Sequence, residues 1–390
     1  MQSVYYGLKL DHVCRKIRSR HKFEYDINAI LSDLVYTRIL EPSSKRSSFQ
    51  AASQYLEPPS YALHDIYHAM SVLAQECDFI QSKVYKNSFF FGKRSDRVLY
   101  YDCTNYYFGI EQEDGDKKYG KSKEHRPNPI IQMGLFTDGD GIPLAFSLFP
   151  GNSNEQTSLK PLEKKILQEF GHDKFIYCSD AGLGSEANRE FNHMGQRAFI
   201  VTQSIKKRPA EERKRALERT GFKRVSDESI ADITSLDQKD KGSLFYKDAP
   251  YTTKKLHQRL VITCSPKYAA YQKTIRGKQI EREEKMVSDG KMKKQRKNPN
   301  DPAGFAGKFL ALLIYRMLEK NPGRKYTCEK LLGTLKGMNF ADVEGQGYMP
   351  LYQRETITDD LHAASGFRTD FQFITKRQMK TIQKRSKGRE

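Results

Sequence analysis

The spacing of apolar residues changes near residue 93, and this change divides the chain into two kinds of sequence. Before that point, apolar residues recur every three or four positions, which is the spacing of an amphipathic helix. One such helix is expected around residues 27–35 and should end before Pro42. A second is expected over residues 61–84, after a loop with two prolines. The pattern therefore predicts a helical N-terminal region over residues 1–92.

Short apolar and aromatic runs replace the helical spacing after residue 93. The run at 97–108 has the length and the β-branched and aromatic content of a buried strand. It contains a carboxylate, Asp102, at the expected exit of that strand. Burying an acid there is costly unless the acid is paired or binds a metal. An aspartate that caps the following turn is an equally good interpretation.

A β-hairpin is expected after this strand. Residues 127–137 and 142–149 form two apolar runs, and the turn sequence Asp138-Gly-Asp-Gly141 separates them. A short turn of glycine and aspartate between two apolar runs is typical of a hairpin.

Four more elements follow the hairpin, in the order helix, strand, helix and strand. They are expected at residues 158–170, 174–180, 186–194 and 196–201. The strand at 174–180 also ends in a carboxylate, Asp180. Strands that alternate with helices after a hairpin predict a mixed α/β sheet.

The composition narrows the class of protein. At 390 residues, with 37% hydrophobic and 11% aromatic residues, the chain is typical of a globular protein with two or three domains. The net charge of +19 favours an anionic partner, most commonly nucleic acid, although ribosomal and membrane-surface proteins share it. The longest apolar run, residues 309–315, is too short to cross a membrane, and no signal peptide is expected. Six cysteines without a Cys-x-x-Cys pair predict reduced thiols in the cytoplasm, not a zinc site or a disulfide framework.

Asp102 and Asp180 are both expected at the carboxyl ends of strands in one sheet. Ligands of open α/β sheets bind at those ends. Two carboxylates that converge there in a basic protein predict a Mg²⁺ site for phosphoryl transfer, because Mg²⁺ takes oxygen ligands together with water and substrate phosphates. Asp102 and Asp180 are therefore the candidate metal ligands and catalytic residues.

Five short motifs carry a resemblance to a known family. They are Tyr100-Tyr-Asp-Cys-Thr104, His125-Arg-Pro-Asn-Pro-Ile-Ile-Gln-Met-Gly-Leu135, Asp138-Gly-Asp-Gly-Ile-Pro-Leu-Ala145, Pro150-Gly-Asn152 with Glu155, and Ser179-Asp-Ala-Gly182. Together they resemble bacterial insertion-sequence transposases of the IS-four type, which are DDE enzymes. The resemblance covers most of residues 20–298 and resumes from about 309 to 384.

The resemblance implies an α/β fold, namely a ribonuclease-H-like mixed sheet with flanking helices. The first part of this core would span residues 93–202, a basic insertion 203–300, and a helical remainder with a basic tail 301–390. Asp102 and Asp180 match the family's first and second catalytic acids, which hold Mg²⁺ in a two-metal site. The implied partner is DNA, as transposon terminal repeats and target, in the cytoplasm at the nucleoid. A homodimer is a candidate assembly, and neither a membrane nor a small-molecule substrate is expected.

The chain departs from the family at the third catalytic acid. That acid belongs to a helix with the pattern Tyr-x-x-Arg-x-x-x-Glu, which this sequence lacks. Glu281 lies in a charged part of the insertion, and Glu319 lies in a segment similar to the helix that follows the catalytic one. The step from residues 297–303 to 307–311 resembles an internal deletion, and the start of the chain resembles an N-terminally shortened member. Loss of one carboxylate from a two-metal site is expected to lower catalysis by orders of magnitude.

Two basic stretches, 206–223 and 254–297, and a basic tail at 376–389 carry much of the positive charge. Such runs are more often solvated surface than DNA contacts. Beside a DDE-like core, they favour contacts that follow the phosphate backbone without reading its sequence. The N-terminal region shows no helix-turn-helix motif. His64 and His68 lie one helical turn apart, but without a third ligand they predict a surface helix and not a metal site.

Three functions stay open from the sequence. The first is a DNA transposase whose metal-dependent strand cleavage and transfer are impaired by the missing glutamate, so that retained enzyme activity is itself an open question. The second is a non-catalytic DNA-binding remnant that competes with intact transposase for transposon ends. The third is a metal-dependent nuclease unrelated to transposition. A third acid near Asp102 and Asp180 would separate the first function from the second.

Overall fold

The computed structural model describes residues 1–125, 127–236, 238–253, 255–288, 305–320, 323 and 325–388. The expected deletion between residues 297 and 307 and the basic run 291–297 therefore lie largely outside the described residues. The chain forms two compact units, and each is described by itself. The first contains Met1–Asn188, Asn192–Ile200 and the described part of Pro299–Glu390, and the second contains Arg189–Phe191 and the described part of Val201–Asn298.

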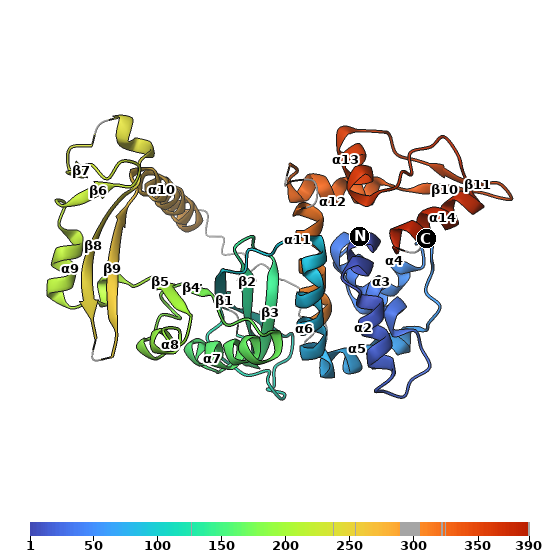
Figure 1. Cartoon of the computed structure of the whole chain (residues 1–390), viewed down its shortest axis with the longest axis horizontal. Coiled ribbons are helices and arrows are strands. Elements are labelled where there is room, and N and C mark those ends of the chain that lie inside the picture. The colour runs from blue at the N-terminus through green and yellow to red at the C-terminus, as the bar shows by residue number, and fades with distance from the viewer. Residues whose placement is uncertain are drawn as a thin grey trace. The chain divides into compact units, whose positions relative to one another are not determined.

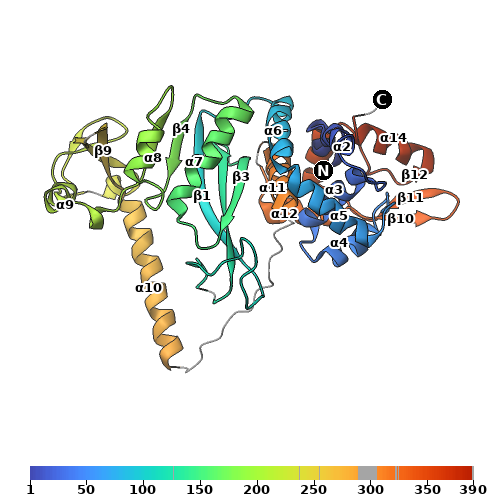
Figure 2. The same cartoon turned by 90° about the horizontal axis from the view of Figure 1, so that it is seen from below.

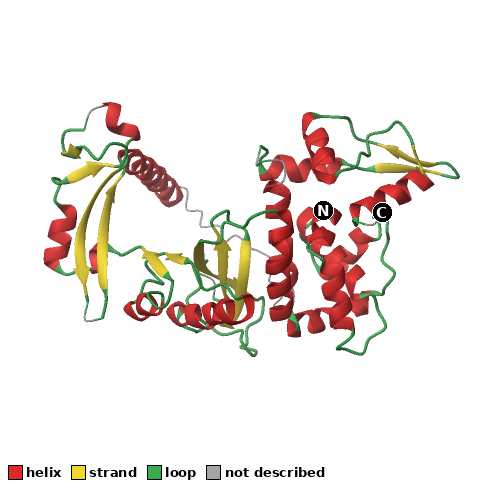
Figure 3. Cartoon of the chain, viewed as in Figure 1, coloured by secondary structure: helices red, strands yellow, loops and turns green. Residues whose placement is uncertain are grey.

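The first unit is built around a five-stranded sheet with the strand order β3-β2-β1-β4-β5 (Figure 1). The strands are β1 Val98–Tyr107, β2 Ile130–Asp138, β3 Pro143–Pro150, β4 Ile176–Ser179 and β5 Ala198–Val201. β2 pairs antiparallel with β1 and with β3, which confirms the predicted hairpin. β1 pairs parallel with β4, so the sheet is mixed, as predicted. Figure 3 shows helices next to this sheet.

Helix α7, Glu155–Lys165, covers one face of the sheet. Its Ser158 hydroxyl lies 2.6 Å from the Tyr101 hydroxyl of β1, and both side chains are buried. The helix begins three residues earlier than expected, because the Asn154 side chain accepts a hydrogen bond from the Gln156 backbone N–H and caps it there. A π-helical turn, η2 (Ile166–Phe170), completes the segment.

Helix α11, Phe305–Lys320, lies against the other face, beside β3 (Figure 2). The Phe309 ring centre is 5.2 Å from that of Phe146 in β3. Lys308 Nζ lies 4.7 Å from the centre of the Tyr106 ring in β1. Because side chains alternate between the two faces of a strand, Asp102 is on the same face as Tyr106. Toward β4 this face stays open, and Tyr100 is 51% exposed.

Six α-helices and one 3₁₀ turn precede the sheet. They are α1 Gln2–Gly7, α2 Leu10–Arg18, α3 Ile27–Leu40, α4 Lys45–Ala52, α5 Leu63–Gln75, α6 Cys77–Ser88 and η1 Phe89–Phe91. The helix expected at 27–35 is α3, which the Asp26 side chain caps. The single helix expected over 61–84 is wrong, because two helices meet at Glu76. The Glu76 carboxylate accepts a hydrogen bond from Arg20 at 2.8 Å and lies 3.0 Å from His21, and apolar spacing does not reveal such long-range contacts.

One hydrophobic core joins these helices to the sheet. α11 packs against α3 on one side and against β3 on the other. Leu310 and Ile314 of α11, Ile30 and Val35 of α3, and Phe146 of β3 are buried in this core. No helix in the described part of the chain is long and apolar enough to span a bilayer.

The C-terminal part of the first unit adds three helices and a small sheet. They are α12 Cys328–Gly337, β10 Phe340–Val343, β11 Gly347–Pro350, α13 Thr356–Ser365, β12 Ile374–Thr375 and α14 Lys376–Ser386. The basic residues expected as a tail form a helix, α14, which Thr375 caps. The Ser386 hydroxyl donates a hydrogen bond to the Gln2 side chain at 2.5 Å, so the last helix lies against the first.

The second unit contains a four-stranded sheet with the order β7-β6-β8-β9. Its elements are η3 Ile205–Lys207, α9 Ala210–Leu217, β6 Phe222–Arg224, β7 Ile230–Ala231, η4 Gln238–Gly242, β8 Phe245–Thr252, β9 His257–Cys264 and α10 Pro266–Ser288, and α8 Glu186–Phe191 leads into it. The apolar run at 260–264 has the sequence of a strand, and it lies in β9. The other strands have weak sequence signals, because Phe222, Phe245 and Leu256 are the only buried apolar side chains among the described residues of this unit, which leaves little apolar periodicity.

Glu163 of α7 is a buried acid that fastens this helix to the segment before β5. Asn192 Nδ2 and Arg197 donate to its carboxylate at 3.0 and 3.1 Å. Burial outweighs these partners and raises the pKa of Glu163 from 4.5 to about 7. A pKa raised by folding means that the folded state binds this proton more tightly than the unfolded state. Stability should therefore fall by about 3 kcal/mol as the pH rises from about 4.5 to 7, and then level off.

Glu163→Gln should remove this dependence, because glutamine keeps a hydrogen-bonding side chain without a titrating proton. Urea unfolding at a series of pH values would measure it. Glu329→Gln, which changes an exposed acid of α12, is the matched control and should keep the wild-type slope. An unchanged slope in Glu163→Gln would assign the pH dependence to other groups.

Candidate metal centre

Asp102 lies in the middle of β1, not at its end. The expectation that it stands at the exit of a buried strand is therefore wrong. The strand continues because residues as far as Tyr107 pair with β2. The Asp102 side chain is 77% exposed, so no burial penalty acts on its charge.

Asp180 directly follows β4, which ends at Ser179 as predicted. Its Oδ1 accepts a hydrogen bond from the Gly182 backbone N–H at 3.0 Å, so one oxygen caps the turn. Its Oδ2 accepts no hydrogen bond from the described residues, and the residue is exposed. Turn capping and a ligand role are compatible at Asp180, because they would use different oxygens.

The strands that carry the two acids, β1 and β4, are neighbours in the sheet and pair in parallel. Tyr100 is opposite Cys178 in this register. Asp102 lies two residues beyond Tyr100 in β1, and Asp180 lies two residues beyond Cys178, directly after the end of β4. Neighbouring strands are about 4.8 Å apart. Both acids therefore belong to neighbouring strands, near the point where the parallel pairing ends.

Lys123 is the basic residue beside this acid pair, and sequence reasoning missed it. Its Nζ is 3.7 Å from Asp102 Oδ1 and also donates to the Cys103 carbonyl oxygen. Its backbone N–H donates to Asn105 Oδ1 at 3.3 Å, which holds the loop against β1. A lysine there can balance the Asp102 charge or contact a phosphate. The only sequence signal was its place in a loop with several lysines.

The described part of the chain contains one group of three His, Cys, Asp or Glu residues whose ligand atoms all lie within 4.8 Å of one another, and this group contains neither Asp102 nor Asp180. Glu319 is paired with Arg316 at 2.9 Å on α11. Glu281 is exposed on α10 of the second unit, and Glu155 opens α7 on the opposite face of the sheet. The missing third acid stays a prediction, since residues 289–304 are not described.

The group of three consists of Asp359, His362 and Asp370, and no sequence pattern had indicated it. Arg368 donates to Asp359 at 2.8 Å and to Asp370 at 2.5 Å, and Arg354 donates to Asp359 at 2.9 Å. The Arg368 side chain lowers the pKa of Asp370 to about 2. Two guanidinium groups thus neutralise the carboxylates whose negative charge would otherwise attract a cation. We therefore interpret the group as an ion-pair network.

His64 and His68 lie on the surface of α5, and their ring centres are 6.4 Å apart. His64 is adjacent to Asp65, at 3.3 Å, and its side chain is 76% exposed. Within the described residues they belong to no group of three ligands. The geometry agrees with the predicted surface helix.

No protein-family model matches the chain, and no curated protein matches it. Solved structures similar to it include a piggyBac transposase synaptic complex with hairpin DNA, at 12% identity and a TM-score of 0.37. That similarity covers 83% of this chain and 75% of the other. They also include a Mos1 transposase paired-end complex with the left transposon end, at 12% identity and a TM-score of 0.20, over 45% of this chain and 58% of the other. Values this low establish neither a shared fold nor a shared activity.

Proposed function

We propose that this chain is a DNA-transposition protein with a ribonuclease-H-like core, in which Asp102 and Asp180 hold Mg²⁺. We propose further that strand cleavage and transfer are impaired, because a third acid is missing from the site. The observation that supports the proposal is the parallel pairing of β1 with β4, the two neighbouring strands that carry Asp102 and precede Asp180.

The donor set fits a hard cation. Both acids offer carboxylate oxygens, and among the described residues neither pairs with a guanidinium group, in contrast to Asp359 and Asp370. Mg²⁺ is commonly bound by one or two carboxylates together with water and substrate phosphates. When bound, Mg²⁺ would polarise a phosphoryl oxygen and lower the pKa of a bound water. Two protein carboxylates are therefore enough to bind one ion, but they are fewer than a two-metal site normally uses.

The residues around the acids would position a phosphate. Lys123 Nζ, beside Asp102, is 47% exposed and can contact a non-bridging oxygen of a bound strand. Tyr100 and the partly buried Thr104 lie on the same face of β1 as Asp102, on either side of it. This open part of the sheet offers carboxylate oxygens that would bind a cation, and a lysine that would contact the phosphate bound to that cation.

The order of elements supports the ribonuclease-H-like assignment. Three antiparallel strands are followed by a helix, a parallel strand next to β1, a second helix and an edge strand. The family motifs fall on this framework, because the Asp138–Gly141 motif forms the β2–β3 turn and the Ser179–Gly182 motif follows β4. The net charge of +19 supports DNA as the partner.

A non-catalytic DNA-binding remnant is the alternative, and one specific observation favours it. The one group of three possible ligand residues in the described part of the chain contains neither Asp102 nor Asp180. Such a protein would keep the phosphate contacts and lose the chemistry, so that it would compete with an intact transposase for transposon ends.

The test is DNA binding and supercoiled-plasmid cleavage with Mg²⁺ or Mn²⁺. The proposal expects salt-sensitive DNA binding and slow, metal-dependent nicking that Asp102→Asn abolishes. Asp342→Asn is the matched control, because Asp342 is also an exposed acid within a strand. Binding without nicking in any variant would establish the remnant function, and metal-dependent nicking without strand transfer would favour a nuclease. Absence of DNA binding would overturn the proposal.

A further inference from the structure

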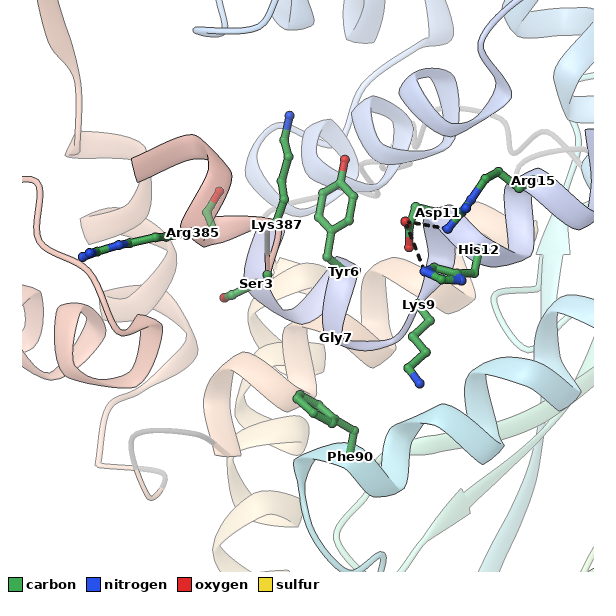
Figure 4. A pocket seen from close by; sticks show the side chains of 12 residues that line it. Ser3, Tyr6, Gly7, Lys9, Asp11, His12, Arg15, Phe90, Arg385 and Lys387 are labelled. Atoms are coloured by element: carbon green, nitrogen blue, oxygen red, sulfur yellow. Dashed lines mark ion pairs between the residues drawn. The ribbon is translucent and has the colours of Figure 1, made fainter. Parts of the chain in front are cut away.

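A groove of about 600 Å³ lies between the first helices and the last one, away from the acid pair (Figure 4). Its walls are the turn between α1 and α2, the 3₁₀ turn η1 and the end of α14. A volume of this size is typical of a small-molecule site, or of a site for one or two nucleotides. Nothing in the proposed chemistry of Asp102 and Asp180 uses it.

The lining of this groove is strongly basic. It contains Lys9, His12, Arg15, Arg385 and Lys387, together with a single acid. That acid, Asp11, is already paired with Arg15 at 3.6 Å and with His12 at 3.7 Å.

Two of these basic residues carry uncompensated charge. Lys387 pairs with Glu57, but neither Lys9 nor Arg385 has an acidic partner among the described residues. The groove therefore attracts an anion.

Both flanking helices extend the positive surface. On α2, Arg15, Lys16 and Arg18 are exposed, and on α14 the exposed basic residues include Lys380 and Lys384. The sequence from residue 376 to 388 contains no acid. Two helices with exposed basic residues beside a basic groove favour a polyanion, such as a chain of phosphates, over a single small anion.

An aromatic ring is presented inside this basic surface. Phe90 of η1 is 73% exposed, and its ring meets that of Phe91 edge-on at 5.3 Å. Phe91 is anchored on Gly7, where an added Cβ would lie 2.4 Å from Phe91 Cζ. The anchored Phe91 thus holds Phe90 toward solvent.

Lys9 sits at the turn between α1 and α2 in an unfavourable backbone conformation. Its φ of 55° and ψ of 36° are left-handed, a region that non-glycine residues rarely adopt. Strain of this kind often marks a functional position. Figure 4 shows the Lys9 and Phe90 side chains on the same side of this turn. One bound molecule could therefore contact both the lysine charge and the aromatic ring.

We infer that this groove binds a single-stranded nucleic-acid segment, with Lys9 and Arg385 at phosphates and a base stacked on Phe90. Exposed aromatic rings between cations are the usual means of holding single strands, because every base has a π face and needs no specific hydrogen bonds. A duplex hides the faces of its bases, so this arrangement should prefer single strands. The inference rests on the groove alone and does not require the acid pair.

The test is fluorescence anisotropy of labelled oligothymidylate and oligouridylate of about 20 nucleotides, and of a duplex of equal length. Phe90→Ala should weaken single-strand binding about tenfold or more. Lys9→Gly should weaken binding and reduce the slope of log K against log salt by about 0.7. Because glycine tolerates the left-handed conformation, Lys9→Gly should keep or raise the melting temperature, which separates lost binding from lost folding.

Matched controls come from exposed residues outside the groove. Phe371→Ala removes another exposed ring, at 53% exposure, and Lys336→Gln removes an exposed charge of α12. Both should bind like the wild type. The inference is overturned if Phe90→Ala binds single strands normally, if the controls weaken binding equally, or if duplex binds as tightly with the same dependence on Phe90. DNA and RNA probes decide which single strand is preferred.

Discussion

Replacing Asp138 with alanine should lower the free energy of unfolding by about 3–5 kcal/mol. Arg94 Nε donates to Asp138 Oδ2 at 2.6 Å, and the two side chains are 2% and 0% exposed. The other carboxylate oxygen accepts the backbone N–H groups of Asp140 and Ile142 at 3.0 and 2.9 Å. Alanine would leave a buried guanidinium without a counter-charge and two N–H groups of the hairpin turn without an acceptor. Urea unfolding followed by circular dichroism would measure the loss.

Two variants test whether burial is the cause. Asp114→Ala removes an ion pair with Lys117 in which the aspartate is 69% exposed, and it should change stability little. The double variant Arg94→Met with Asp138→Asn removes both charges and keeps an acceptor for the turn. It should be less destabilised than Asp138→Ala, because no unpaired charge stays buried. Equal losses in Asp114→Ala and Asp138→Ala would contradict this account.

The sequence predicted the elements whose signal is local. The Asp138–Gly141 turn between two apolar runs predicted the β2–β3 hairpin, and the spacing around residues 27–35 predicted α3. The break at Glu76 was missed, because the contacts of Glu76 with Arg20 and His21 join residues 56 and 55 positions apart, respectively. Asp138 itself was read as a turn residue, and its buried partner Arg94 lies 44 positions away.

The candidate site was also predictable only where its signal is local in the sequence. Asp102 and Asp180 were chosen because both were expected at the carboxyl ends of strands in one sheet, and the strands β1 and β4 are indeed neighbours that pair in parallel. The position of Asp102 within its strand depends on pairing with β2, which no property of the strand alone reveals. Lys123 approaches Asp102 from a loop 21 positions later in the chain, so no local pattern could have placed it there.

Asparagine at Asp102 or at Asp180 should weaken binding of a divalent cation on the order of 10-fold or more, because each change removes one of the two charged ligands. Asparagine preserves the shape of both side chains, and at residue 180 it can still accept the turn hydrogen bond from Gly182. The fold should therefore be unaffected. Mn²⁺ is a suitable probe, since carboxylate and water ligands suit it as they suit Mg²⁺.

The most direct measurement is the titration of the protein with Mn²⁺, followed by electron paramagnetic resonance of the free ion. Wild type, Asp102→Asn, Asp180→Asn and the control Asp342→Asn would be compared, with Mg²⁺ as competitor. We predict one Mg²⁺-displaceable site that both single variants lose and the control keeps. If Asp102→Asn and Asp180→Asn bind Mn²⁺ like the wild type, the two acids do not form a metal site, and the proposed function loses its foundation.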